Sequence, residues 1–94
     1  MGPAMKRREK AAETNVVEVG FLRSELQVGL TLTRIAMDAR HHDKSKRNCI
    51  NARKAYDSVL RFLPNVSLSA DESKEIASKL KQLRAELEVL GEKV

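Results

Sequence analysis

The feature that most constrains this chain is an apolar helix side that one neighbouring helix is too narrow to cover. At about 100° per residue, residues 15–40 place their apolar side chains over more than half of the helix circumference. These side chains are Val17, Val19, Phe21, Leu22, Leu26, Val28, Leu30, Leu32, Ile35, Ala36, Met37 and Ala39. A surface helix needs an apolar stripe only somewhat wider than about 100°. We therefore expect this helix to be central and covered from two directions.

Small residues along the same side predict a close approach by another helix. Gly29, Thr33 and Ala36 lie along it. A glycine inside a helix costs about 1 kcal/mol relative to alanine, so close packing is the expected compensation. At the start of the pattern, Asn15 and the acidic Glu18 three residues later resemble a capping pair.

A second helix is predicted over residues 44–63. Pro64 ends it, because the residue before a proline avoids helical backbone angles. Its outer face is charged and its inner face is apolar. The expected inner face is Cys49, Ala52, Ala55, Tyr56, Val59, Leu60 and Leu63.

A third helix is predicted over residues 70–90. Ser69 and Glu72 form a capping box at its start, and Gly91 is a natural stop at its end. No segment alternates apolar and polar residues as a half-buried strand does. The sequence thus predicts an all-α antiparallel three-helix bundle over residues 14–91. Residues 1–13 are expected to form a flexible basic leader, of which MGPAM reads as an added start before a natural Met5.

The first two helices carry a spaced set of small, aromatic and proline residues. In the second helix these are Ala52, Tyr56, Val59 and Pro64, and in the first they are Leu32, Ile35, Ala36 and Ala39. Over residues 32–64 this pattern resembles the helical hairpin of a tetratricopeptide repeat, with a turn several residues longer. Three-helix modules of the microtubule-interacting and trafficking type share the small-residue pattern. The resemblance implies a module that binds peptides or partner helices without catalysis.

A single repeat lacks the stacked neighbours that normally bury its faces. The third helix could supply this cover, or a second copy of the chain could supply it in a homodimer.

Positive charge gathers on the second helix. The net charge is +5, and residues 41–63 contribute +4, from six basic and two acidic side chains. On the outward face Ile50 lies among basic residues, an arrangement typical of a small interface anchor. We predict that Arg47, Ile50, Lys54 and Arg61 contact a protein partner.

The same residues suit two other functions. A basic nucleic-acid-binding accessory protein is the main alternative, and its affinity would fall steeply with added salt. Against it stand the lack of a known DNA-binding signature and of an aromatic platform for single strands. A small helical protein without an assigned role is the third alternative.

Neither a metal site nor an enzyme is expected. His41, His42, Asp43 and Cys49 are potential ligands, but adjacent histidines point apart and a structural zinc site needs four convergent ligands. There is no phosphate-binding loop and no nucleophile motif, so we predict no catalysis and no cofactor. No apolar run reaches the roughly 18 residues of a membrane span, and no signal peptide is expected. A single cysteine suits a reducing compartment and hence the cytoplasm.

Overall fold

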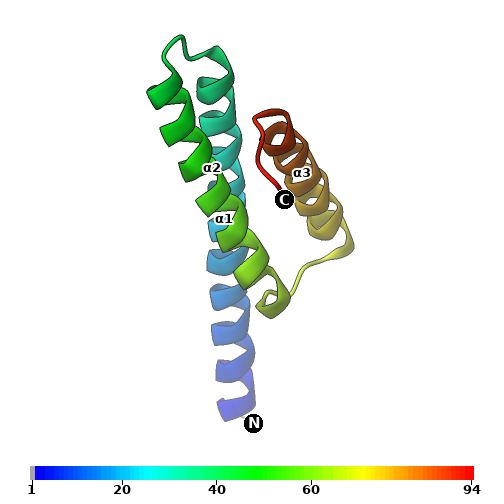
Figure 1. Cartoon of the computed structure of the whole chain (residues 1–94). Helices are drawn as coiled ribbons and strands as arrows, with labels where there is room; N and C mark the ends of the chain where they lie inside the picture. Colours follow the sequence, from blue (N-terminus) through cyan, green and yellow to red (C-terminus); the bar gives the residue numbers. More distant parts are fainter. Residues whose placement is uncertain (1) are drawn as a thin grey trace.

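The chain is entirely helical in its computed structural model, which describes the backbone of residues 2–94 and the side chains of residues 15–94. Helix α1 spans Gly2–Asp38, α2 spans His42–Phe62, and α3 spans Ala70–Val89. A short 3-10 helix, η1 (Leu63–Asn65), extends α2. Figure 1 shows successive helices running in opposite directions, with α1 packed against both α2 and α3. The predicted all-α three-helix architecture is confirmed, and no strand occurs between residues 2 and 94.

Helix α1 begins earlier than the sequence pattern indicated. It starts at Gly2, so Asn15 lies inside the helix and does not cap it. The preceding residues are rich in alanine, lysine, arginine and glutamate, which are strong helix formers. The side chains of the expected leader, residues 1–13, lie outside the described part of the chain. The division into a leader and a domain from residue 14 therefore stays a prediction.

The turn between α1 and α2 lies two residues earlier than the predicted helix bounds place it. Because α1 ends at Asp38 and α2 begins at His42, only residues 39–41 join them. The longer turn expected from the repeat resemblance is therefore wrong, since most of the polar stretch after His41 forms the first turns of α2. Ser45 Oγ donates a hydrogen bond to the Ala36 carbonyl oxygen at 2.8 Å, which ties the start of α2 to the end of α1.

An aliphatic core lies where the three helices meet. Its largest fully buried members are Leu22, Leu26, Thr33, Val59, Ile76, Leu83 and Leu87. Full burial of one such leucine is worth about 1.5–3 kcal/mol relative to its exposure. The expected inner face of α2 is buried from Cys49 to Val59, but Leu60 is 44% exposed. Successive residues are about 100° apart, so Leu60 is rotated away from the core position that Val59 occupies.

Gly29 allows α3 to pack closely against α1. A Cβ atom at this position would lie 2.7 Å from Leu83 Cδ2 of α3 and 3.5 Å from the Ala55 Cβ of α2. The first distance is shorter than real Cβ contacts allow, so only glycine fits without displacing Leu83. The close approach predicted from the small-residue strip is confirmed, with Thr33 and Ala36 also buried.

Both ends of α3 follow the sequence signals. The Ser69 hydroxyl accepts a hydrogen bond from the Glu72 backbone N–H at 3.1 Å, and a Glu72 carboxylate oxygen accepts one from the Ser69 N–H at 2.9 Å. Gly91 has φ of 95°, which is a left-handed conformation. The Glu92 N–H then donates to the Leu87 carbonyl at 2.9 Å, and the Gly91 N–H donates to that of Glu88 at 3.0 Å. These two bonds form a Schellman motif that ends the helix.

Candidate partner-binding surface

The four predicted contact residues lie together on the exposed face of α2. Arg47, Lys54 and Arg61 are all exposed and are seven residues apart, which is close to two helical turns. We call these three the basic row. Ile50 lies beside it and is 44% exposed, so it is not a core residue. The structure thus brings the predicted residues together, and their binding role stays a prediction.

A second feature lies on α1, and its members could not be singled out from the sequence. Val17, Phe21, Val28 and Ile35 are 71%, 40%, 49% and 39% exposed. Their spacing of four, seven and seven keeps them on one side of the helix. We call these four the apolar stripe. They belong to the wide apolar side recognised in the sequence, but which part of that side stays uncovered depends on where α2 and α3 pack.

The apolar stripe runs along the junction of α1 and α2, on the side away from α3. Near its first end, a hollow is lined by Val17, Phe21, Phe62 and Val66 together with two polar residues, and α3 contributes none of its lining. The rings of Phe21 and Phe62 meet edge to face, with centroids 5.4 Å apart and an interplanar angle of 87°. This edge-to-face geometry is favourable for aromatic pairs.

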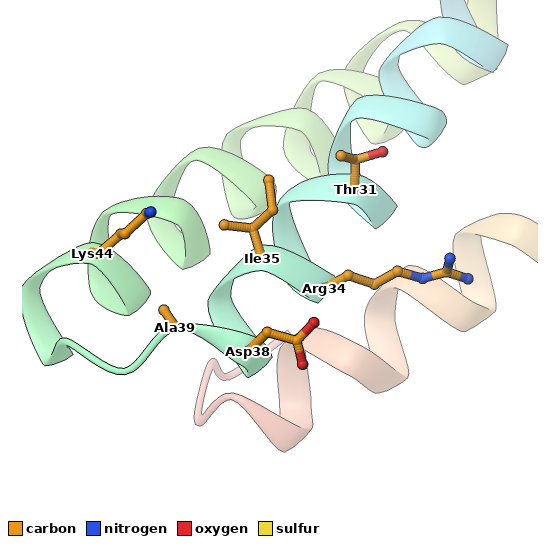
Figure 2. A pocket seen from close by; sticks show the side chains of 6 residues that line it. All are labelled: Thr31, Arg34, Ile35, Asp38, Ala39 and Lys44. Atoms are coloured by element: carbon orange, nitrogen blue, oxygen red, sulfur yellow. The ribbon is translucent and has the colours of Figure 1, made fainter.

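The other end of the apolar stripe is bordered by charge. Figure 2 shows a hollow in which Ile35 of α1 lies between Lys44 of α2 and Thr31 of α1, with Arg34 and Asp38 projecting from the neighbouring side of α1. An apolar floor with a charged edge is the usual composition of a binding surface. We call the surface formed by the apolar stripe, Phe62 and Lys44 the hairpin flank.

Five exposed cations of α1 and α2 lack ion-pair partners among the side chains that the structure describes. Over residues 15–94, no carboxylate lies within ion-pair distance of Arg34, Lys44, Arg47, Lys54 or Arg61. The ion pairs of the described chain lie elsewhere, and they join Arg23 to Glu75, Arg53 to Asp57 and Glu92, and Arg84 to Glu88. The hollows at the hairpin flank are lined by two cations, Arg34 and Lys44, and two acids, Glu18 and Asp38, so they carry no net charge.

One of the paired cations lies on the side of the hairpin that α3 covers. Arg23 Nε lies 2.6 Å from Glu75 Oε2, where it joins α1 to α3. The hydrogen bond from Arg23 lowers the pKa of the Glu75 carboxyl below its ordinary value, and the attraction of the same guanidinium acts in the same direction. Glu75, which is next to the buried Ile76 of α3, thus pairs with Arg23 at the edge of α1.

The candidate metal ligands of the sequence do not gather. His41, His42 and Asp43 are exposed, whereas Cys49 is buried in the inner face of α2. Burial raises the pKa of the Cys49 thiol, with the charge of Glu92 as a smaller cause. Among the side chains that the structure describes, no three of His, Cys, Asp or Glu come together as a metal-binding group.

Comparisons with known proteins leave the family open. No protein-family model matches the chain, and no significant match was found among curated proteins or solved structures. In the part of the chain that the structure describes, none of the helices is long and apolar enough to cross a membrane.

Proposed function

We propose that this chain is a helical protein–protein interaction module that binds its partner along the hairpin flank. The observation that carries the proposal is the apolar stripe, a row whose side chains remain 39–71% exposed in the folded chain. Single exposed apolar residues are common and usually mean little. A row on one side of a helix, with an aromatic pair at one end, is the arrangement that anchors helix-to-groove contacts.

The shape of the hairpin supports the same proposal. Two helices joined by a short turn and carrying small residues at their contact resemble the binding hairpins of tetratricopeptide repeats, and this likeness stays part of the proposal. The module needs no catalytic group and no cofactor to act in this way. The reduced, buried Cys49 suits a reducing compartment such as the cytoplasm.

A stripe substitution tests the proposal, with a matched control elsewhere. Val28→Asp places a charge in the apolar stripe, and Val89→Asp makes the same change at an α3 valine that is 77% exposed. The chain and both variants serve as bait in extracts of the source cell, and light scattering gives their masses at low and high salt. We expect Val28→Asp to lose the captured partner, or to lose self-association, while Val89→Asp keeps it. Identical captures and a monomer mass for all three proteins would refute the proposal.

Nucleic-acid binding is a second candidate function, and the basic row favours it. Arg47, Lys54 and Arg61 follow one side of α2, where they could meet successive phosphates. Binding of this kind loses affinity in proportion to the logarithm of the salt concentration, with a slope near −0.9 for each phosphate contacted. An apolar partner contact survives added salt, so a salt titration of any complex separates the two candidates.

A further inference from the structure

We infer that the occupant of the hairpin flank is a second copy of this chain, with the two α1 helices packed antiparallel along their apolar stripes. This inference rests on the proposed function and names the partner of the same surface. Three properties of the exposed side of α1 support it: the spacing of its side chains, their sizes, and the charges at its two ends.

The spacing of the exposed side chains on α1 suits another helix. Ser24 and Thr31 are exposed and fall in the gaps of the apolar stripe. With them the stripe occupies residues 17, 21, 24, 28, 31 and 35, at intervals of four and three in turn. Two helices interlock their side chains along a shared seam at these intervals. The order of the intervals is the same from either end, so a second α1 that runs in the opposite direction presents a matching seam.

The sizes of these side chains match when the second copy is antiparallel. In the arrangement centred at the level of residue 26, Phe21 faces Thr31 of the second copy and Val28 faces its Ser24. Large side chains then meet small ones in the middle of the seam, which is how facing layers fill space. In a parallel arrangement Phe21 would meet Phe21 and Ser24 would meet Ser24, with crowding at one level and a gap at the next.

The charges at the two ends of the stripe select the same direction. At the end near Val17, Glu18 is the charged residue of the hollow. At the other end the hollow is lined by Arg34, Lys44 and Asp38, so its net charge is positive (Figure 2). An antiparallel second copy brings the acidic end of each chain to the basic end of the other. A parallel copy would bring each end against its like.

Glu18 and Lys44 are the charges best placed to pair between the copies. Neither has an ion-pair partner within residues 15–94. Glu18 shares its hollow with Phe62 of α2, and Lys44 belongs to α2, so both lie on the α2 side of the stripe. A two-fold axis between antiparallel α1 helices places these two sides next to each other. Within one chain the two ends of the stripe are about 27 Å apart, at about 1.5 Å per residue, so this pair forms only between copies.

A charge exchange on the full chain tests the inference. Sedimentation over a dilution series gives the dissociation constant of the dimer, and circular dichroism verifies that each variant is folded. We expect Glu18→Lys and Lys44→Glu each to weaken the dimer severalfold, and the double variant to return to within about twofold of the unmodified chain. Single variants that dimerise as tightly as the unmodified chain would overturn the inference. A double variant no tighter than the single variants would do the same.

Cysteine cross-linking tests the direction of the second copy. In a Cys49→Ala background, Val17→Cys and Ile35→Cys are prepared as separate chains and mixed under mild oxidation. The antiparallel arrangement brings residue 17 of one chain to residue 35 of the other, while two residues 17 stay about 27 Å apart, too far for a disulfide. We expect a cross-link in the mixture at least about tenfold faster than in either variant alone, or in Val17→Cys mixed with Val89→Cys. Faster cross-linking of Val17→Cys to itself would show a parallel pair and overturn the inference.

The mass of the chain separates this inference from the proposed function. A chain that stays monomeric up to about 1 mM would overturn the second copy as occupant. If Val28→Asp then lost a protein that the unmodified chain captures, the hairpin flank would still be an interaction surface. A dimer that Val28→Asp leaves intact, with identical captures by the two proteins, would overturn both. A dimer that Val28→Asp dissociates and that recovers in the charge exchange supports both.

Discussion

The two sides of the α1–α2 hairpin differ although both are apolar. On the side covered by α3, small residues line α1 and α2, and Gly29 and Ala55 leave room for Leu83. On the hairpin flank, β-branched and aromatic side chains such as Val28 and Phe21 project into solvent. Gly29 and Val28 are neighbours in sequence and differ completely in exposure. Hydrophobicity alone therefore does not decide which side is filled within the chain; the covered side is the one where small residues let another helix approach.

The largest expected effect tests whether the side covered by α3 contributes more to the free energy of unfolding than the apolar stripe does. Leu83→Ala removes a fully buried side chain and should lower the free energy of unfolding by about 2–5 kcal/mol. Ile35→Ala on the apolar stripe should cost about 1 kcal/mol or less, because this side chain is 39% exposed and few of its contacts are lost. Urea unfolding followed by circular dichroism measures both. Equal losses would mean that the stripe belongs to the core.

The next effect compares two glycines of α1. Gly20 has no heavy atom within 4 Å of an added Cβ, so Gly20→Ala should stabilise the chain by up to about 1 kcal/mol through helix propensity. Gly29→Ala gains the same propensity but presses on Leu83, and overpacking of this kind costs about 1–3 kcal/mol. In a Leu83→Ala background the cost of Gly29→Ala should disappear. If Gly29→Ala stabilises the unmodified chain, Leu83 packs less tightly against residue 29 than the distances indicate.

A smaller effect concerns the capping box at the start of α3, the helix that covers one side of the hairpin. Ser69→Ala removes the hydroxyl of the capping box and should cost about 1 kcal/mol of unfolding free energy. Ser67→Ala is the matched control, since Ser67 is exposed in the preceding loop and should change stability by less than about 0.5 kcal/mol. Thermal unfolding measures the stabilities of the two variants. Equal stabilities would show that packing alone holds α3 in place.

The smallest effect is a dependence on pH at the edge of the covered side. Because Arg23 lowers the pKa of Glu75 in the folded chain, the unfolded chain binds a proton at this carboxyl more readily. The pair therefore stabilises the fold above the ordinary carboxyl pKa, and its contribution is lost as the pH falls through the lowered folded value. Glu75→Gln should remove this part of the acid sensitivity, by a small amount because both side chains are exposed. Unfolding curves from neutral to acidic pH that coincide in shape for the two proteins would contradict it.

Local signals predicted much of the fold correctly. The Ser69–Glu72 box, the stop at Gly91 and the small residue at Gly29 each act through a few neighbouring atoms, so their outcome was readable from the sequence. The start of α1 was not, because the expected cap at Asn15 competes with a preceding run of strong helix formers. The position of the turn before α2 also differs from the prediction, since polar and charged residues after His41 suit a loop and an exposed first helical turn equally well.

The candidate surface was only partly predictable. The basic row and Ile50 follow from helical periodicity within α2, which a sequence displays directly. The apolar stripe and its contact between Phe21 and Phe62 join residues far apart in the chain. They arise because α3 packs on one side of the hairpin and leaves the other open. Periodicity shows that a helix side is apolar, but the packing of the other helices determines how much of it remains exposed.

The contact between Gly29 and Leu83 also sets where α3 lies along the hairpin axis. A helix with leucines at regular intervals could slide by one turn, about 5.4 Å, and still present an apolar seam to its neighbours. Only the position of Gly29 lets Leu83 approach so closely, and a shift of α3 would press that side chain against a residue with a Cβ. The absence of a side chain at residue 29 therefore fixes the position of α3 along the hairpin axis. It gives α3 a single alignment along the α1–α2 hairpin.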